Sequence, residues 1–183
     1  MDNSIRIGHG WDRHALKKGK PLFLMGVKID SDKGPVSHSD GDVISHVVSD
    51  AILGASSLGD IGKLFPDNET WTEGISGTDL LKKTLDFVNQ KNPISIIQVD
   101  VIVKLEEPRL SPYLGIIEDR LALILNTENI RVTARHGEGI GAVGRKECID
   151  ATAVILISNL DNVYSILAFS SINRIISKTN FLN

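Results

Sequence analysis

The sequence has one cysteine, few aromatic residues and no excess of positive charge. A single thiol excludes a disulfide within the chain and favours a reducing compartment, and Cys148, in an apolar run, is interpreted as a small core residue. The formal net charge of -3 leaves no clustered basic surface for nucleic acid. No stretch approaches the roughly 20 apolar residues that span a bilayer, and no secretory signal is recognised. We expect a cytoplasmic protein without nucleic-acid or membrane partners.

The 183 residues, of which 42% are hydrophobic, suit a single compact domain. Runs rich in β-branched residues predict strands over residues 5–10, 21–29, 95–105 and 130–134. Helical spacing of apolar residues predicts helices over 41–57, 78–90, 113–125 and 146–157, with an irregular loop over 59–74. This alternation predicts an α/β (α+β) fold with helices packed on one face of a sheet. Residues 161–183 have an apolar helical face, and we expect a terminal helix docked on the body or on a neighbouring subunit.

Two polar motifs carry the candidate metal ligands. In GHGWDRH, where the first strand is expected to give way to a loop, Asp12 and His14 leave the same face of an extended chain, opposite His9. In HSDGDVISH, Asp42 and His46 are four apart and share a helix face. Asp12, His14 and His46 would give a zinc ion nitrogen and oxygen donors with a fourth position open, as catalytic zinc sites have. Such a metal beside helix N-termini suits phosphate chemistry.

These motifs, with HSDGDVISHVVSDAILGASSLGDIGKLFPD and the later GRKECI, resemble the 2-C-methyl-D-erythritol 2,4-cyclodiphosphate synthase family over about residues 5–160. The resemblance implies a single compact domain with a mixed sheet, assembled as a homotrimer with active sites between subunits. It also implies conversion of 4-diphosphocytidyl-2-C-methyl-D-erythritol 2-phosphate into the 2,4-cyclodiphosphate with release of CMP, in the non-mevalonate isoprenoid pathway. In this reaction the 2-phosphate oxygen attacks the β-phosphorus. The protein has to position the two phosphates and neutralise their charge. We interpret residues 1–160 as the catalytic domain and 161–183 as an extension.

The resemblance further implies roles for individual residues. One zinc ion per active site would be held by the aspartate and two histidines named above, and Glu138 would help to hold magnesium or manganese between the α- and β-phosphates. His38 and His136 match the two transition-state stabilisers. The other implied substrate contacts are Ser39, Asp60, Ile61, Gly62, Phe65, Pro66, Asp67, Asn68, Glu69, Arg135, Gly137, Ala142 and Arg145. The implied cytidine pocket consists of Leu105, Glu106, Glu107, Pro108, Arg109, Leu110, Ser111 and Ala134.

One segment departs from the family pattern. Where the family has Ala-Thr-Thr-x-Glu-Lys-x-Gly-Phe, this sequence reads ARHGEGIGA over residues 134–142. We hypothesise that Arg135 and His136 replace neutral hydrogen-bond donors with charged or chargeable ones that still neutralise phosphate. The alternative is weakened turnover, which would leave a weakly active or inactive nucleotide-binding trimer. Ala142 argues against isoprenoid-diphosphate binding on the trimer axis, although Arg145 remains.

Two other functions compete with this interpretation. GIGAVG over residues 139–144 matches a dinucleotide-binding fingerprint between a predicted strand and a predicted helix, but no following strand is expected to supply the ribose-binding acid. A zinc hydrolase that attacks phosphate esters with metal-bound water would use the same metal ligands. Binding of cytidine nucleotides distinguishes the synthase from the hydrolase.

Overall fold

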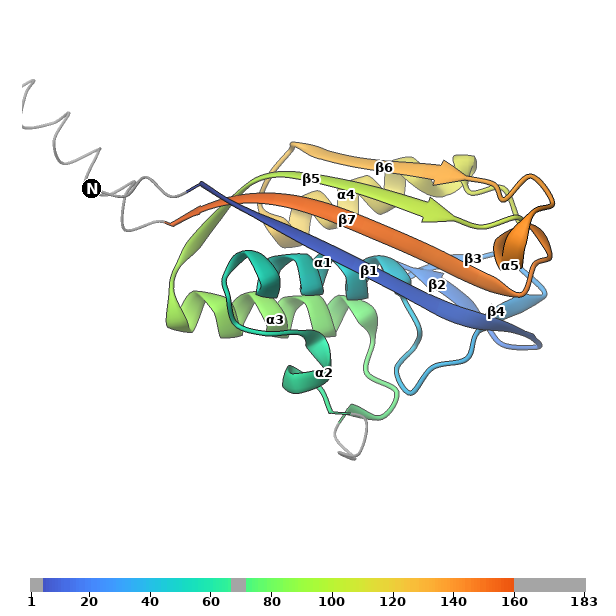
Figure 1. The fold of residues 1–183 in the computed structure, drawn as a ribbon, viewed down its shortest axis with the longest axis horizontal. Helices are drawn as coiled ribbons and strands as arrows, with labels where there is room; N and C mark the ends of the chain where they lie inside the picture. The colour runs from blue at the N-terminus through green and yellow to red at the C-terminus, as the bar shows by residue number, and fades with distance from the viewer. Residues whose placement is uncertain (1–4, 67–71, 160–183) are drawn as a thin grey trace, which may run out of the picture.

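The computed structural model describes residues 5–66 and 72–159, which form a mixed α/β domain (Figure 1). Its main sheet has five strands in the order β4-β1-β7-β5-β6, and β2 and β3 form a separate hairpin. β5 and β6 pair in parallel, and the other ladders of the sheet are antiparallel. The strands are β1 (Ile5–Lys18), β2 (Leu22–Leu24), β3 (Val27–Ile29), β4 (Lys33–Pro35), β5 (Ile94–Lys104), β6 (Ile130–Arg135) and β7 (Cys148–Asn159).

The strand at the centre of the sheet shows that the helix predicted over residues 146–157 was wrong. β7 pairs with β1 on one side and with β5 on the other. Its alternate residues, such as Ile149 and Ala153, are fully buried, whereas Val154 on the opposite face is 47% exposed. Both faces of β7 carry apolar residues, so its sequence does not distinguish a strand period from a helix period.

The motif GHGWDRH lies inside β1 rather than at its end, which corrects the expected change from strand to loop. β1 continues to Lys18 and places Asp12 opposite Ala151 of β7. Asp12 and His14 point toward the helices, because successive side chains of a strand alternate between faces. His9 points the other way, as predicted, and its Nε2 lies 2.8 Å from Thr152 Oγ1.

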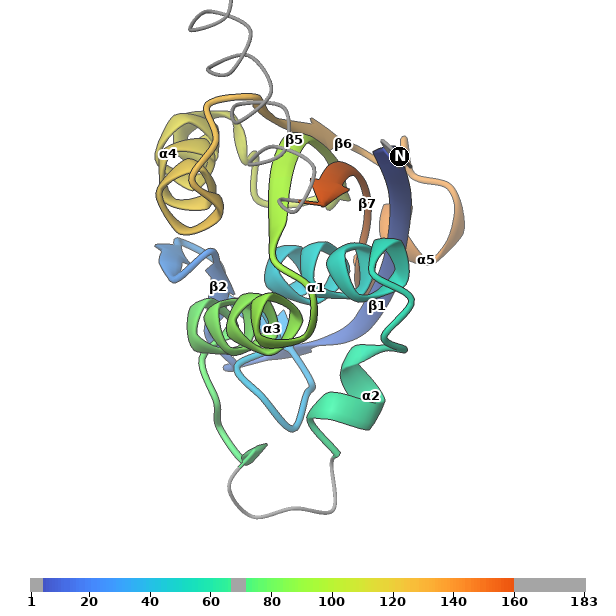
Figure 2. The same cartoon turned by 90° about the vertical axis from the view of Figure 1, so that its left-hand side faces the viewer.

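Three helices cover one face of the sheet, as the sequence predicted (Figure 2). α1 packs against β1 and β7, α3 packs against α1, and α4 lies along β6. The hydrophobic core lies between these helices and the sheet. A short helix, α2, interrupts the segment 59–74 that was expected to be irregular. The helices are α1 (Val43–Ala55), α2 (Ile61–Leu64), α3 (Gly77–Lys91), α4 (Leu114–Leu125), α5 (Gly141–Gly144) and the 3-10 turn η2 (Ser111–Tyr113).

Two glycines of β1 allow α1 to approach the strand closely. A Cβ on Gly10 would lie 2.0 Å from the carbonyl oxygen of Val47, and a Cβ on Gly8 would lie 1.8 Å from that of Ala51. Backbone atoms of a packed helix cannot give way by that amount, so a side chain at either position would push α1 off the sheet. This contact brings the first turns of α1 against the part of β1 that carries Asp12.

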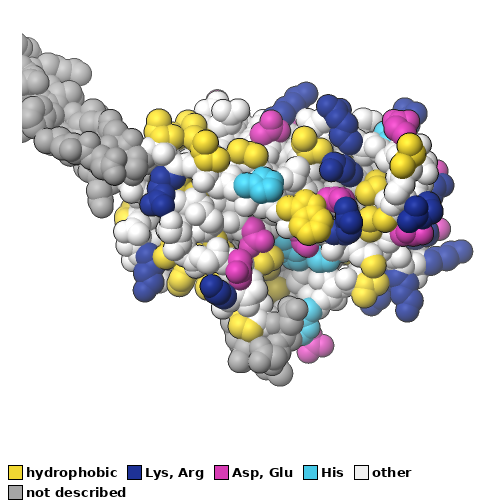
Figure 3. All heavy atoms as spheres, in the orientation of Figure 1, with side chains coloured by type: hydrophobic (Ala, Val, Ile, Leu, Met, Phe, Trp, Pro, Cys, Tyr) yellow, Lys and Arg dark blue, Asp and Glu magenta, His cyan; other side chains and the backbone are white. Residues whose placement is uncertain are grey.

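The opposite face of the sheet is uncovered in a single chain. Ile7 is 70% exposed, Ile5 61%, Trp11 55% and Val154 47%, all on β1 or β7. Figure 3 shows hydrophobic side chains spread over this side of the molecule. Within the described ranges, no helix has the length and apolar character needed to cross a membrane.

Candidate metal centre and active site

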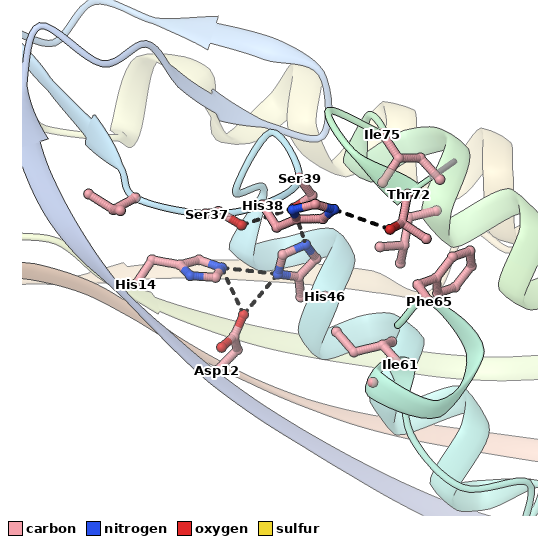
Figure 4. Close-up of a pocket in the computed structure, with 13 residues that line it drawn as sticks. Asp12, His14, Ser37, His38, Ser39, His46, Ile61, Phe65, Thr72 and Ile75 are labelled. Atoms are coloured by element: carbon pink, nitrogen blue, oxygen red, sulfur yellow. Dashed lines mark hydrogen bonds and ion pairs between the residues drawn. The ribbon is translucent and has the colours of Figure 1, made fainter. Parts of the chain in front are cut away.

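Three polar side chains from two elements converge at the side of β1 that faces α1 (Figure 4). Asp12 Oδ2 lies 2.9 Å from His46 Nδ1 and 3.0 Å from His14 Nε2. The two imidazole nitrogens are 3.0 Å apart, and their rings meet edge to face. The predicted ligand triad is therefore brought together, and it is the one group of three potential ligands found among the residues that the structure describes.

The start of α1 determines where His46 lies, because His46 is the fourth residue of this helix. Asp42 caps α1, because its carboxylate accepts the backbone N–H of Ser45 and also that of Gly26. Asp42 is therefore a helix cap rather than a fourth ligand, although it shares the helix face of His46. The capped first turn directs His46 toward β1, and the imidazole is only 6% exposed.

Ser39 contacts the second nitrogen of the His46 ring. Ser39 Oγ lies 3.1 Å from His46 Nε2 and accepts the backbone N–H of Gly41 at 3.2 Å. A histidine that binds a metal through Nδ1 carries its hydrogen on Nε2. Ser39 is thus the acceptor that fixes this tautomer, and its own hydroxyl hydrogen is free to bond Ser37 Oγ, 3.1 Å away.

The charges at the centre favour an ionised aspartate beside a protonated histidine. Burial raises the pKa of Asp12, but the hydrogen bonds and charges of His14 and His46 outweigh it and hold this pKa well below its usual value. Burial lowers the pKa of His46, while the hydrogen bond and charge of Asp12, with Asp42 and Asp40, raise it overall. Burial and the charge of Asp40 raise the pKa of Asp42 to about 6. A cation between the three ligands would replace the proton on His46, and a divalent ion would leave the centre one positive charge richer, which favours an anionic ligand.

The donor set fits zinc. All ligand atoms lie within 4.8 Å of one another, and the closest pairs are about 3.0 Å apart. Donors at about 2.0–2.1 Å from a tetrahedral ion stand roughly 3.3 Å apart, so a slight outward movement admits the metal. One carboxylate and two imidazoles are the ligand type of catalytic zinc sites, which keep a fourth position for substrate or water.

A cavity of about 500 Å³ opens beside the three ligands. Five residues predicted to bind substrate or to stabilise its transition state line it, namely His38, Ser39, Ile61, Gly62 and Phe65. Asp60 caps α2 by accepting the N–H of Lys63, and the carbonyl of Pro66 accepts the hydroxyl of Thr72. The other predicted members of this segment, Asp67, Asn68 and Glu69, lie outside the described residues.

A second cavity, of about 310 Å³, lies at the far edge of the sheet. Its lining includes part of the predicted cytidine pocket and also Arg135 and His136, the two residues that replace the family's threonines. Of the predicted residues, Leu105, Glu106, Glu107 and Pro108 do not line it. The residues that line it are Arg109, Leu110, Ser111, Leu114, Arg131, Val132, Thr133, Ala134, Arg135 and His136.

Within one chain, the two cavities are separate. They share no lining residue, and β7 and β5 stand between β1 and β6. Three steps between neighbouring strands amount to about 14 Å. The structure therefore does not bring His136 or the exposed Glu138 to the metal ligands of the same chain. Ala142 lies in α5, and Arg145 just after it pairs with Glu147 at 2.9 Å.

The arrangement of strands and ligands agrees with comparisons to known proteins. The model of the YgbB family matches residues 5–158. The chain belongs to the YgbB family. The 2-C-methyl-D-erythritol 2,4-cyclodiphosphate synthase of Fusobacterium nucleatum is 41% identical over 155 residues, which are 84% of this chain and 96% of that protein. The predicted family resemblance is thus confirmed.

Solved structures of YgbB-family proteins share the fold. The bifunctional IspDF from Campylobacter jejuni superposes with a TM-score of 0.80 at 34% identity, covering 85% of this chain and 42% of that one. A 2C-methyl-D-erythritol-2,4-cyclodiphosphate synthase in a CDP-bound form has a TM-score of 0.77 at 34% identity, covering 84% of this chain and 100% of that one. The second comparison places a cytidine nucleotide on a protein of this fold.

YgbB-family topology removes the basis of the dinucleotide-binding alternative. The segment GIGAVG leads through the four-residue α5 into β7, which is antiparallel to β5. A dinucleotide fingerprint opens a longer helix and a parallel βαβ unit. The glycines instead allow close packing, because a Cβ on Gly144 would lie 2.3 Å from the backbone of Gly139.

Two residues that hold the lining of the first cavity in place were not among the predicted site residues. Asp50 Oδ1 accepts the backbone N–H of Ile61 at 2.8 Å and so anchors the start of α2. Asp50 lies four residues after His46, and this spacing in the sequence indicates that the two side chains share a face of α1. Thr72 Oγ1 lies 3.2 Å from His38 Nε2, a contact between distant loops that no sequence pattern indicates.

Proposed function

We propose that the chain is a 2-C-methyl-D-erythritol 2,4-cyclodiphosphate synthase. The observation that carries the proposal is the convergence of Asp12, His14 and His46 beside a cavity of about 500 Å³ in a YgbB-family fold. The substrate is 4-diphosphocytidyl-2-C-methyl-D-erythritol 2-phosphate. A 2-phosphate oxygen forms a new bond to the β-phosphorus, the bond from that phosphorus to the α-phosphate oxygen breaks, and CMP leaves. The product is the cyclic diphosphate.

The residues of the first cavity have distinct tasks in this proposal. Asp12, His14 and His46 hold zinc, which supplies positive charge to diphosphate oxygens when bound. His38 and Ser39 both line the cavity; His38 donates a hydrogen bond to a phosphate oxygen, and the hydroxyl hydrogen of Ser39 turns from Ser37 Oγ to another phosphate oxygen when substrate binds. The segment Asp60 to Gly62, with the nearby Phe65 to Glu69, holds the erythritol part. The Asp50 carboxylate supports this segment from α1.

The second half of the site comes from a neighbouring subunit. β1, which carries the metal centre, and β6, which lines the second cavity, stand about 14 Å apart in the sheet, too far for one diphosphate to meet both in the same chain. The exposed apolar side chains on β1 and β7 suit contact with further copies. We infer a homotrimer in which the cavity lined by Arg109 to Ser111 and Ala134 receives cytidine, with Leu105 to Pro108 forming the backbone beside it, and Glu138 binds magnesium or manganese with the diphosphate. Gly137, Ala142 and Arg145 complete this half.

The segment that departs from the family pattern keeps its function in this proposal. Arg109, Arg131 and Arg135 line the second cavity together with His136, and the three arginines make it cationic, which suits a diphosphate. His136 stands where the family has a threonine. Restoring that threonine in His136→Thr should therefore leave CMP release unchanged or lower it, whereas a large gain would contradict functional replacement.

Residues 1–160 would supply the complete catalytic unit, with 161–183 as an extension that the reaction does not require. The family model, which matches residues 5–158, supports this division. The predicted terminal helix lies outside the described residues.

Product analysis tests the proposed reaction. The purified full chain with zinc and magnesium should convert the substrate into equal amounts of CMP and cyclic diphosphate. Phosphorus NMR measures both products. Open-chain phosphate products without the cyclic diphosphate would favour the zinc hydrolase. CDP should also raise the melting temperature. CDP binding without turnover would point to the inactive trimer.

Complementation between subunits tests the shared site. His46→Ala removes the metal half and His136→Ala the nucleotide half, so each variant alone should be impaired. Random assortment of the two chains in co-expressed trimers leaves about a quarter of the sites with both halves intact. Recovery of activity to that level supports interfacial sites. A monomer mass by light scattering would overturn the shared site, and so would the absence of any recovered activity in the co-expressed variants.

A further inference from the structure

The side chain of Glu106 anchors the turn that follows the two residues replacing the family's threonines. The turn between β6 and β7 passes the carboxyl end of β5, as Figure 1 shows. Glu106 Oε2 accepts the backbone N–H of Gly137 at 2.7 Å, and Oε1 accepts that of Gly139 at 3.3 Å. Two backbone N–H groups two residues apart make a small anion-binding concavity. In this chain, the concavity is filled by the protein's own carboxylate.

The same residue contacts the side chain of His136. The ladder of β5 and β6 ends with Leu105 N–H donating to the carbonyl of Arg135, which puts Glu106 beside His136. His136 Nδ1 lies 3.2 Å from the carbonyl oxygen of Glu106. A carbonyl oxygen accepts and never donates, so Nδ1 must carry a hydrogen. The remaining ring nitrogen, Nε2, is then free for a ligand.

Backbone geometry explains why this turn needs an anchor. Glu138 has φ of 52° and Gly139 has φ of 72°, so two successive residues occupy the left-handed region. For the non-glycine Glu138 this conformation costs about 1 kcal/mol or more and persists only when contacts hold it. The carboxylate of Glu106 supplies contacts on both sides of Glu138, and the Ile140 N–H closes the turn by donating to the Gly137 carbonyl at 2.8 Å.

We propose that Glu106 is the positioning residue for His136, its side chain fixing the turn after the histidine and its carbonyl fixing the ring, so that Nε2–H of the imidazolium form donates to a phosphate oxygen. This inference rests on the proposed function, and it deepens that function at the point where the chain departs from its family. The family resemblance placed Glu106 in the cytidine pocket, whereas its side chain turns away to the backbone of the turn and does not line the cavity.

Hydrogen exchange measures the anchor without reference to activity. Glu106→Gln keeps one acceptor oxygen but places an NH2 group against an N–H donor, so one charge-assisted bond is lost. Exchange of the Gly137 and Gly139 amides should accelerate about tenfold or more. Glu118→Gln is the matched control, because Glu118 also accepts a backbone N–H, that of Val132 at 2.8 Å, outside the turn. Unchanged exchange in Glu106→Gln would overturn the proposal.

A double-mutant cycle with His136→Ala tests whether Glu106 acts through the histidine. Glu106→Gln should lower kcat for CMP release about tenfold with little change in KM, and should have no further effect when His136 is already alanine. A full, additive loss in the His136→Ala background would show a merely structural role and sink the proposal. If the wild type releases no CMP, the proposed function fails, and the same cycle is measured on CDP affinity instead.

Nitrogen NMR of the wild type gives a second measurement that needs no variant to fold. With His136 neutral at alkaline pH, its ring should show the hydrogen on Nδ1 and none on Nε2. The opposite tautomer would contradict the contact to the Glu106 carbonyl, and with it the proposal.

Discussion

Asp12 Oδ2 and His46 Nδ1 lie 2.9 Å apart, although 34 positions separate the two residues in the chain. One belongs to a strand and the other to the helix packed on it, so the contact exists only because α1 lies directly on β1. The metal centre therefore depends on the same packing that holds the core together. Substitutions of the ligands and substitutions at the contact of α1 with β1 therefore affect the centre in different ways.

Removing one metal ligand should abolish both zinc binding and turnover. His14→Ala leaves two donors, which cannot hold zinc against solvent, and the loss of a Lewis acid worth several kcal/mol should lower CMP release by about a thousandfold. Metal content by mass spectrometry and product release should fall together. Retention of stoichiometric zinc with full activity would contradict the ligand assignment.

Ser39 should tune the affinity of the centre for zinc. Ser39→Ala removes the acceptor of His46 Nε2–H. The loss of such a hydrogen bond to a metal ligand typically weakens metal binding by about 10- to 100-fold, and we expect about tenfold here. Ser37→Ala is the control, since it leaves Ser39 Oγ in place. Competition with a zinc chelator measures both variants, and equal affinities for the two would count against the role of Ser39.

The metal-free protein should gain stability from Asp12 and His46 within a limited pH window. Asp12 has a lowered pKa, so its contribution exists above its ordinary value of 3.8 and is lost as pH falls further. His46 has a raised pKa, so its contribution is complete below 6.5 and is lost as pH rises through the folded value.

The difference in free energy of unfolding between wild type and Asp12→Asn should therefore peak between these two values. With chelator present, we expect about 1 kcal/mol there, discounted for the partial exposure of Asp12. Urea unfolding across the pH range measures it, and the shared contribution of Asp42 cancels in the comparison. A difference that stays constant with pH would argue against the ion pair.

Two glycine substitutions should have opposite effects on stability. Gly10→Ala would place a Cβ 2.0 Å from the carbonyl oxygen of Val47, and we expect a loss of about 3 kcal/mol or more with displacement of α1 from β1. Gly54→Ala, inside α1, meets nothing within 4 Å and should gain about 0.5–1 kcal/mol from helix propensity. Zinc affinity should fall in the first variant alone. If Gly10→Ala changed neither the stability nor the zinc affinity substantially, the close approach of α1 to β1 would not be what positions His46.

The sequence alone determined the family, the candidate triad of metal ligands and most elements of the fold. Asp12 and His14 share a face because a strand alternates, and α1 was predictable from its spacing and its capping aspartate. These features depend on neighbours a few residues away, and such local periodicities are visible in the chain itself.

Only the tertiary structure decided the nature of β7, the separation of the two cavities and the role of Glu106. Residues 148–159 carry apolar side chains on both faces, so pairing with β1 and β5, rather than local preference, made them the central strand. His136 lies far from the metal ligands of its own chain because two strands intervene, a fact that no spacing in the sequence reports. The anchoring of Gly137 by Glu106 joins residues 31 positions apart, and such contacts form only when the whole sheet has assembled.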